Sequence, residues 1–374
     1  MVSAKRKECV LVRVLISAGG TGGHINPAIA IGKYIVSQDE KNEVLFIGSK
    51  GSLEEKLYKN SGLAYSLHIS KGLDRKNLFN NIKILKEDYN AYREILKIAK
   101  KFKPDIGISC GGYISFMAME AVKKVNAPFI ITEQNAFPGL TTKLLSKDAK
   151  KYCLAFEEAK KFLKYPERAV VTGNPVRQEF SELKKEDARI KLGIPSDKKM
   201  ILCFGGSLGA EKLNEAFFEL IKRVEKESGI ILYVGTGKRY YEDFIKNIKY
   251  TNNNIIIKEY IEDMPTVLMA CDVAVTRAGA MTVSELCAAK KPCILIPSPN
   301  VTADHQTKNA RVISDKSGGI LIKESELSSE KFSDELLKLI KDDGRLTEMG
   351  ENLSSLCVLD GAERIYLSLK EVLS

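Results

Sequence analysis

The sequence predicts an α/β protein of two doubly wound, Rossmann-like domains, each built on a parallel sheet with helices on both faces. Short β-branched runs that end in Gly or Ser alternate with longer amphipathic stretches, which is the pattern of strands and their crossover helices. A glycine-rich turn follows a strand at residues 19–24 and again at residues 205–210. The length of 374 residues fits two domains of roughly 150 residues or more.

In chain order, the strands expected in the first domain lie at residues 10–17, 44–47, 106–109, 129–132 and 169–172. Those expected in the second domain lie at residues 200–204, 230–234, 255–258, 273–276 and 293–296. A further strand is expected around His68, which we interpret as a structural histidine. Residues 174–197, between the two sets, are polar and charged, so we place the domain change there.

The composition, 44% apolar and 28% charged, excludes disordered and collagen-like chains. The longest uncharged stretch, residues 106–119, has 14 residues, too few to cross roughly 30 Å of hydrocarbon, so no transmembrane helix is expected. Arg13 interrupts the first apolar run and glycines follow it, which favours a buried strand over a signal peptide. The eight cysteines form no CxxC pair, so we expect reduced core thiols in a cytosolic protein and no zinc site.

The formal net charge is +10. Such a surplus favours an anionic partner, which is nucleic acid, anionic lipid or a phosphorylated substrate. The alternative is a lysine-rich surface that is simply solvated. No RNA-binding motif or cluster of aromatic residues accompanies the charge, so nucleic acid is not the expected partner.

Both glycine turns suit a phosphate ligand, because glycines let the backbone approach it and the following helix offers free N–H groups. A tight turn without a ligand is the alternative for either one alone. The dinucleotide pattern fails, since Ile25 stands at the third glycine position. A P-loop fails as well, because Arg239 follows the pair Gly237 and Lys238. A nucleotide diphosphate that carries another group fits better.

Polar side chains at the expected loop ends could act on such a ligand. His24 is a candidate general base or phosphate donor, or alternatively a helix cap. Asp304 and Gln306, beside His305, could bind sugar hydroxyls. No D-x-D pair occurs to hold Mg²⁺ against a diphosphate, so no metal or cofactor is expected, and amides, hydroxyls and Arg must meet the charge of the leaving group.

Residues 277–285 form the densest group of such side chains, between an expected strand and an expected helix. Thr282 could face a phosphate, and Arg277 could add charge-assisted bonds to it. Glu285 could accept both hydroxyls of a ribose. The alternative for Glu285 is an acid in the first helical turn that the helix dipole stabilises.

Seven motifs, in order along nearly the whole chain, resemble those of glycosyltransferase family 28. They are GGTGGH at residues 19–24, GGY at 111–113, EQNAFPGLTTK at 133–143, GNPVR at 173–177, GGSLGA at 205–210, RAGAMTVSEL at 277–286 and ADHQTKNA at 303–310. The resemblance is to the N-acetylglucosaminyltransferases of that family, which make lipid II for peptidoglycan.

This resemblance implies a GT-B fold, in which two Rossmann-like domains face each other across a cleft. Residues 1–173 would form the acceptor and membrane-associating domain, and residues 174–355 the UDP-GlcNAc-binding domain. Residues 356–374 would form a C-terminal helix that returns to the first domain. The implied reaction is transfer of GlcNAc from UDP-GlcNAc, with inversion, to the C4 hydroxyl of MurNAc in lipid I, the undecaprenyl-diphosphate-linked acceptor.

The resemblance also implies site residues. Ile261 would meet uracil through its backbone, Glu285 would hold the ribose, and Ser207 and Thr282 would meet phosphates. The full set implied for UDP-GlcNAc, with Arg277 added from the residues themselves, is Thr21, Gly22, Gly23, Asn135, Arg177, Ser207, Ile261, Arg277, Ala280, Met281, Thr282, Val283, Ser284, Glu285 and Gln306.

The general base is expected to be His24 or Glu133, with His24 ranked first because its unperturbed pKa of about 6.5 suits the task. In the family this histidine is alternatively a ligand of the acceptor diphosphate. Two positions depart from the family pattern, in which Asn is usual at Thr142 and Gln is frequent at Leu208. The change at Leu208 puts one sugar or phosphate contact in doubt.

Residues 71–103 carry ten basic and four acidic side chains. An apolar stripe at helical spacing lies beside some of these cations and could enter the headgroup region of an anionic leaflet, although a core-facing stripe is the alternative. We therefore expect a peripheral protein on the cytoplasmic side of the cell membrane. The expected membrane contacts are Lys76, Leu78, Phe79, Ile82, Lys83, Leu85 and Lys86.

Three other functions remain open. The same fold could carry a UDP-sugar epimerase or a lipid glycosyltransferase with another acceptor. A nucleotide-sugar sensor or scaffold that binds without turnover is a different class, which release of UDP on adding a lipid I analogue would exclude.

Overall fold

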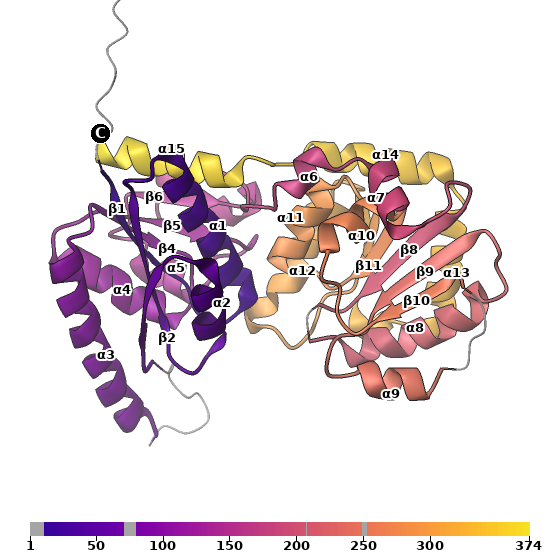
Figure 1. The fold of residues 1–374 in the computed structure, drawn as a ribbon, viewed down its shortest axis with the longest axis horizontal. Coiled ribbons are helices and arrows are strands. Elements are labelled where there is room, and N and C mark those ends of the chain that lie inside the picture. The colour runs from indigo at the N-terminus through magenta and orange to yellow at the C-terminus, as the bar shows by residue number, and fades with distance from the viewer. Residues whose placement is uncertain (1–10, 71–79, 207, 249–252) are drawn as a thin grey trace, which may run out of the picture. The chain divides into compact units, whose positions relative to one another are not determined.

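The computed structural model describes residues 11–70, 80–206, 208–248 and 253–374, with the backbone alone at 80–83. The chain divides into an N-terminal unit, Met1–Pro175 with Asp360–Ser374, and a C-terminal unit, Val176–Leu359 (Figure 1). The sequence placed these two divisions after residues 173 and 355.

The N-terminal unit contains a sheet of seven parallel strands in the order β3-β2-β1-β4-β5-β6-β7. Its central strands are wholly buried, as expected for a parallel sheet that helices cover on both faces. The strands are β1 (Arg13–Ser17), β2 (Glu43–Ser49), β3 (Ala64–His68), β4 (Ile106–Ser109), β5 (Phe129–Glu133), β6 (Lys151–Leu154) and β7 (Ala169–Val171).

Helices cover both faces of this sheet, with α1, α2 and α15 on one and α3, α4 and α5 on the other (Figure 1). The C-terminal helix α15 packs on α1, and its Ile365 and Leu369 are buried in the same cluster as Ile31. Its return to the first domain is therefore confirmed. The helices are α1 (Gly22–Gln38), α2 (Leu53–Ser61), α3 (Asn80–Phe102), α4 (Tyr113–Lys124), α5 (Leu140–Leu145), η1 (Glu157–Phe162), η2 (Pro166–Arg168) and α15 (Gly361–Leu373).

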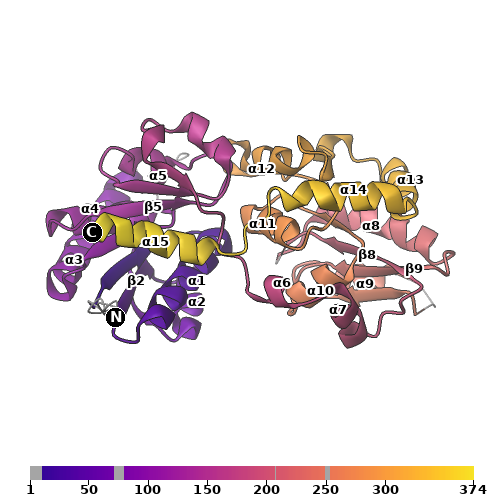
Figure 2. The same ribbon diagram turned by 90° about the horizontal axis from the view of Figure 1, so that it is seen from above.

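The C-terminal unit repeats the architecture with six parallel strands in the order β10-β9-β8-β11-β12-β13. The strands are β8 (Lys199–Phe204), β9 (Ile230–Gly235), β10 (Ile255–Lys258), β11 (Val273–Thr276), β12 (Cys293–Leu295) and β13 (Gly319–Leu321). Figure 2 shows the helices around this sheet. They are α6 (Glu179–Glu182), α7 (Lys185–Leu192), α8 (Glu211–Val224), α9 (Tyr241–Lys246), α10 (Met264–Ala270), α11 (Ala280–Ala288), η3 (Thr302–Asp304), α12 (His305–Ser314), η4 (Glu324–Glu326), α13 (Ser329–Ile340) and α14 (Asp343–Ser354).

The predicted α/β class and every predicted strand are confirmed, although β1 begins only at Arg13. The sequence did not predict β6 and β13. Both are short, and β6 begins with Lys151 whereas β13 begins with Gly319, so neither presents the β-branched run that identifies a buried strand.

Strand order fixes where a ligand can bind in each unit. The connections leave β1 and β4, or β8 and β11, in opposite directions along the sheet, and ligands of such sheets bind at the carboxyl ends of the strands at this reversal. The glycine turns and the group at residues 277–285 directly follow strands at these reversals, and they continue into the first turns of α1 and α11.

Three further features concern the described part of the chain only. Its seven cysteines are free thiols, and all are buried except the half-buried Cys357. It contains no helix long and apolar enough to cross a membrane. Nor does it bring together three or more His, Cys, Asp or Glu side chains in a way that could hold a metal ion.

Candidate active site

Two loops of the N-terminal unit interlock where its strand order reverses. The amide of Gly19, after β1, donates to the carbonyl of Gly111, after β4, at 3.0 Å. At Gly112 a Cβ would lie 2.4 Å from the carbonyl oxygen of Gly19, so only glycine allows this approach. Both Gly111 and Gly112 have positive φ, at +94° and +86°, a conformation that favours glycine.

His24 is oriented by this junction. Its Nδ1 lies 3.0 Å from the carbonyl oxygen of Gly19, and because a carbonyl can only accept, Nδ1 carries the hydrogen. The neutral ring therefore keeps its lone pair on Nε2, for which no described group is a partner. The helix-cap alternative is wrong, since Thr21 occupies the N-cap of α1 and His24 bonds back into the loop.

The start of α1 places Thr21, Gly22 and Gly23 next to His24. Thr21 is exposed, and its hydroxyl makes no capping hydrogen bond. The first N–H groups of a helix have no partner within the helix and favour an anion. This turn can therefore receive a phosphate or a sugar hydroxyl.

Glu133, the other candidate base, is buried at the end of β5 with 4% of its surface exposed. Its Oε1 accepts from the backbone and side-chain nitrogens of Asn135, at 3.1 and 3.2 Å. Its Oε2 accepts from the amide of Gly139 at 2.9 Å and from the Thr142 hydroxyl at 2.6 Å. The carboxylate, which has about four acceptor sites, is thus fully engaged.

In the C-terminal unit the glycine turn after β8 interlocks with the loop after β9. A Cβ at Gly209 would lie 2.1 Å from the carbonyl oxygen of Thr236, and one at Gly237 would lie 2.2 Å from the amide of Gly209. Leu208 projects into solvent from this turn, with 74% of its surface exposed. Ser207, expected to meet a phosphate, lies outside the described residues.

Glu285 lies on α11, where Arg177 holds it. The Nε and Nη2 atoms of Arg177 donate to Oε1 of Glu285 at 3.1 and 2.8 Å. Burial raises the pKa of Glu285, and the Arg177 guanidinium opposes this rise. No described group bonds Oε2, so this oxygen can accept from a ligand. The structure thus gives Glu285 a specific partner in addition to any effect of the helix dipole.

Arg277 is held by other residues of the C-terminal unit. Its Nη1 donates to the carbonyls of Ile296 and Pro297, at 3.0 and 3.1 Å, and its Nη2 pairs with Glu324. These bonds fix the loop that follows β12. A guanidinium has five N–H donors, so direct contact of Arg277 with a phosphate stays a prediction.

The other residues predicted to bind UDP-GlcNAc in the C-terminal unit follow its strands or lie on α11. Gln306 accepts at Oε1 from the amide of Ser298 at 2.8 Å. Ile261 is buried, and its Cδ1 lies 2.9 Å from where a Cβ at Gly235 would be. In α11, Ala280, Val283 and Ser284 are buried, whereas Met281 and Thr282 are partly exposed.

Two residues that support the site were not predicted from the sequence. Glu54, only 1% exposed, accepts from the amide of Gly20 at 3.0 Å and so fixes the first glycine turn. Asn309, 1% exposed, donates to the carbonyl of Ala278 at 3.2 Å. Glu54 lies in a helical segment where its local pattern is that of an ordinary surface residue, so no local signal distinguishes it. Asn309 lies in the motif at residues 303–310, and that motif is the signal that could have identified it.

His68 and α3 complete the comparison with the sequence. His68 is buried between Glu94 and the hydroxyl of Ser66, which confirms the structural interpretation. On α3, Leu85 is 54% exposed and Lys86 is also exposed, so a core-facing role for Leu85 is wrong. Of the other expected membrane contacts, Lys76, Leu78 and Phe79 lie outside the described residues, as do the side chains of Ile82 and Lys83.

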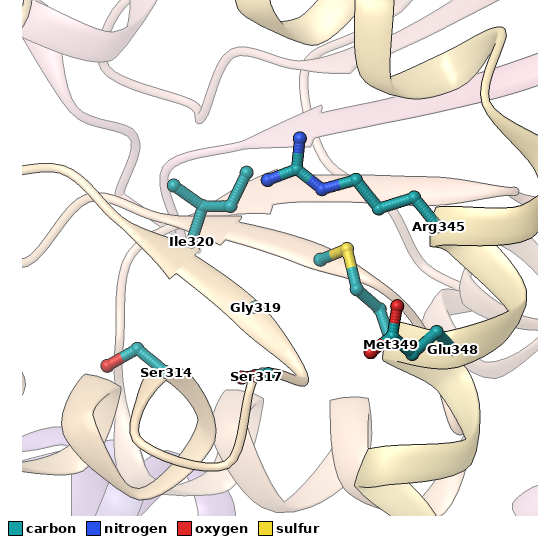
Figure 3. Close-up of a pocket in the computed structure, with 7 residues that line it drawn as sticks. All are labelled: Ser314, Ser317, Gly319, Ile320, Arg345, Glu348 and Met349. Atoms are coloured by element: carbon teal, nitrogen blue, oxygen red, sulfur yellow. The ribbon is translucent and has the colours of Figure 1, made fainter.

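A pocket of about 290 Å³ lies beside β13 in the C-terminal unit (Figure 3). Its lining contains none of the predicted site residues. The lining residues are Ser314, Ser317, Gly319, Ile320, Arg345, Glu348 and Met349.

Two family models match the chain. The glycosyltransferase family 28 N-terminal domain matches residues 14–153, and the glycosyltransferase family 28 C-terminal domain matches residues 200–365.

Similar proteins cover nearly the whole chain. A relative from Acetivibrio thermocellus, named UDP-N-acetylglucosamine–N-acetylmuramyl-(pentapeptide) pyrophosphoryl-undecaprenol N-acetylglucosamine transferase, is 40% identical over 97% of this chain and 98% of its own. A relative of the same name from Bacillus subtilis is 37% identical over 96% of this chain and 99% of its own. The crystal structure of Acinetobacter baumannii MurG is similar with a TM-score of 0.77 and 26% identity, over 96% of this chain and 99% of that one.

Proposed function

The chain belongs to glycosyltransferase family 28, and from this premise we propose that it transfers GlcNAc from UDP-GlcNAc to the C4 hydroxyl of MurNAc in lipid I. The product is lipid II, and the anomeric carbon is inverted. The chain is an N-acetylglucosaminyltransferase with the two Rossmann-like units of a GT-B enzyme. The observation that carries this conclusion is the 40% identity, over nearly the full length of both chains, to a relative named for this reaction.

The N-terminal unit is proposed to bind the acceptor and to accept the proton of its C4 hydroxyl. Nε2 of His24 accepts the proton of the C4 hydroxyl as its oxygen attacks the anomeric carbon of GlcNAc and the bond from that carbon to the UDP oxygen breaks. The hydrogen bond from Nδ1 to the carbonyl of Gly19 favours this role, because it fixes the tautomer whose Nε2 is basic and stabilises the ring once it is charged. Thr21, Gly22 and Gly23, at the start of α1, lie beside the sugar in this assignment.

The C-terminal unit is proposed to hold UDP. Oε2 of Glu285 accepts from the ribose hydroxyls, and the backbone of Ile261 meets uracil. Thr282 and the N–H groups at the start of α11 and α8 donate hydrogen bonds to the phosphates. These groups balance the phosphate charge, because the sequence has no D-x-D pair that could bind a cation there. Hydrogen-bond donors held in place in this way stabilise the charge that develops on the leaving diphosphate.

We also propose that α3 holds the protein against anionic lipid of the inner leaflet. Leu85 and Tyr89, one helical turn apart, are 54% and 61% exposed. Exposed cations continue along the same side of α3, at Lys86, Arg93 and Lys97. Large apolar side chains beside cations favour an anionic membrane surface, and the acceptor is itself bound to the membrane.

Radiolabelled UDP-GlcNAc with a short-chain lipid I analogue tests the reaction. Wild type should form labelled disaccharide, and His24→Ala should lose about 100-fold or more in kcat, as expected for removal of a general base. The matched control is His68→Ala, which removes a buried histidine outside the site. A disaccharide yield unchanged in His24→Ala would refute the assigned base. UDP-GlcNAc alone tests the epimerase alternative, because only an epimerase changes its sugar without an acceptor.

A further inference from the structure

The buried Glu133 carboxylate connects both ends of the loop formed by residues 134–141. Glu133 ends β5, and Thr142 lies in the first turn of α5, just after Leu140 and Thr141, the two helical residues that we count with the loop. The Thr142 hydroxyl reaches Oε2 at 2.6 Å, and the Gly139 amide reaches the same oxygen at 2.9 Å. Thr142 is only 2% exposed, so water does not compete readily for this hydrogen bond.

The same loop is attached to the junction that orients His24. Next to Thr142, the Thr141 hydroxyl donates to the carbonyl of Gly112 at 3.1 Å. Gly112 lies against the carbonyl of Gly19, and that carbonyl accepts from Nδ1 of His24. A shift of the loop therefore reaches His24 through three contacts in a row, with Gly112 and Gly19 as the two intermediate residues.

A general base needs a lone pair that faces the hydroxyl to be deprotonated. In Glu133 four N–H or O–H groups occupy the two oxygens, and 4% of the residue is exposed. A substrate hydroxyl would have to displace one of the donors that shape the loop. This arrangement suits a carboxylate that holds structure rather than one that exchanges protons.

We propose that Glu133 and Thr142 are positioning residues, which hold the loop of residues 134–141 against the glycine junction of His24, and that Glu133 is not the general base. The inference rests on the proposed transfer reaction. It also gives the departure from the family pattern at position 142 a physical role, since the threonine hydroxyl supplies the donor that an asparagine amide would supply.

Four variants, assayed for disaccharide formation, test this inference. Thr142→Val keeps the side-chain shape but removes the donor, Thr142→Ser keeps the donor, and Glu133→Gln removes the charge and two acceptor sites. Ser146→Ala is the control, because the Ser146 hydroxyl donates to the carbonyl of Lys143 and has no other hydrogen-bond partner among the described residues. Each variant is characterised by kcat, the acceptor KM, the pH profile of kcat, the melting temperature and the calorimetric affinity for UDP.

Thr142→Val should lower kcat about tenfold or more, because even a displacement of about 1 Å at a reacting group can cost up to about 100-fold. Thr142→Ser should stay within about threefold of wild type, and Ser146→Ala should match it. UDP affinity should be unchanged throughout. The kcat that remains in Glu133→Gln should still decrease at low pH, with the same midpoint as in wild type, because the proposed base, His24, is still present.

A folded Thr142→Val with wild-type kcat would overturn the inference, and so would a Glu133→Gln variant that has lost the acid limb of its profile. If Thr142→Val is unfolded at the assay temperature, the inference is tested instead by the kcat of Thr142→Ser and by the pH profile of Glu133→Gln, both measured at a lower temperature. Failure of the wild type to form disaccharide would refute the proposed reaction instead, so the two failures are distinguishable.

Discussion

Arg177 donates both Nε and Nη2 to a single carboxylate oxygen of Glu285, at 3.1 and 2.8 Å. The two residues lie 108 positions apart in the sequence. The contact occupies Oε1 and leaves Oε2 for a ligand. Arg177 therefore acts on the proposed ribose site in two ways. It orients the Glu285 carboxylate, and it favours the ionised form of that carboxylate.

Arg177→Ala should raise the KM for UDP-GlcNAc about tenfold, with a smaller effect on kcat, since a charge-assisted bond contributes about 1.5–3 kcal/mol. Burial already raises the pKa of Glu285, and Arg177 lowers it. Removing Arg177 should raise that pKa further. The ionised carboxylate accepts hydrogen bonds from the ribose hydroxyls. As the pH falls, Arg177→Ala should therefore lose its affinity for UDP-GlcNAc at a higher pH than wild type does.

The measurement is the donor KM from pH 5 to 8 in wild type and Arg177→Ala. Arg223→Ala is the control, because Arg223 pairs with Glu219 on the surface of α8. An identical pH dependence in wild type and Arg177→Ala would contradict the role given to Arg177.

Gly111→Ala should reduce kcat by about 100-fold, the loss that a displacement of about 1 Å at a reacting group can cause. A Cβ at this position would lie 2.9 Å from Cδ2 of His24, so the imidazole must move. Gly51→Ala is the matched control: Gly51 also has a positive φ, +71°, but a Cβ there meets nothing within 4 Å. Both variants should lose similar stability, and only Gly111→Ala should lose activity. Equal activity in the two would refute a steric effect on His24.

Arg277→Lys should lower the free energy of unfolding by about 2 kcal/mol, because an ammonium cannot replace the fork of the guanidinium. The lost bonds are those to Ile296, Pro297 and Glu324. Since these bonds fix the loop after β12, the donor KM should also rise. Urea unfolding and the kinetics with UDP-GlcNAc test both effects, with Arg364→Lys as the control, because Arg364 is exposed and pairs with Asp360 on the surface of α15. Weaker donor binding at unchanged stability would instead indicate direct contact with the ligand.

Replacing Leu85 and Tyr89 together by Ser should weaken binding to anionic vesicles about tenfold or more, because both exposed apolar side chains would lose their burial in lipid. Reversing the charge at Lys76, Lys83 and Lys86 should weaken it further and remove its dependence on anionic lipid.

Vesicle sedimentation at several anionic lipid contents measures both effects. The controls lie in the C-terminal unit: Ile190→Ser, where Ile190 is 78% exposed on α7, and Lys222→Glu on α8. Binding that ignores both lipid charge and the α3 substitutions would contradict the membrane proposal.

Much of the molecule follows from local sequence signals. Strand runs and glycine turns predicted two parallel-sheet units and the loops that carry the site, because backbone preference and the need for positive φ are encoded residue by residue. The edge strand β13 escaped prediction because three residues, Gly319–Leu321, show no periodicity.

The sequence by itself determined the fold class, the family and the types of side chain at the carboxyl edges of the two sheets. Only the tertiary structure decided what those side chains do: Glu133 is enclosed by four donors, Arg277 is held by Glu324, and the proton of His24 is placed on Nδ1. The reason is physical. A buried polar group takes whichever partner packing brings within about 3 Å, and that partner can lie far away in the chain, as Glu324 does from Arg277.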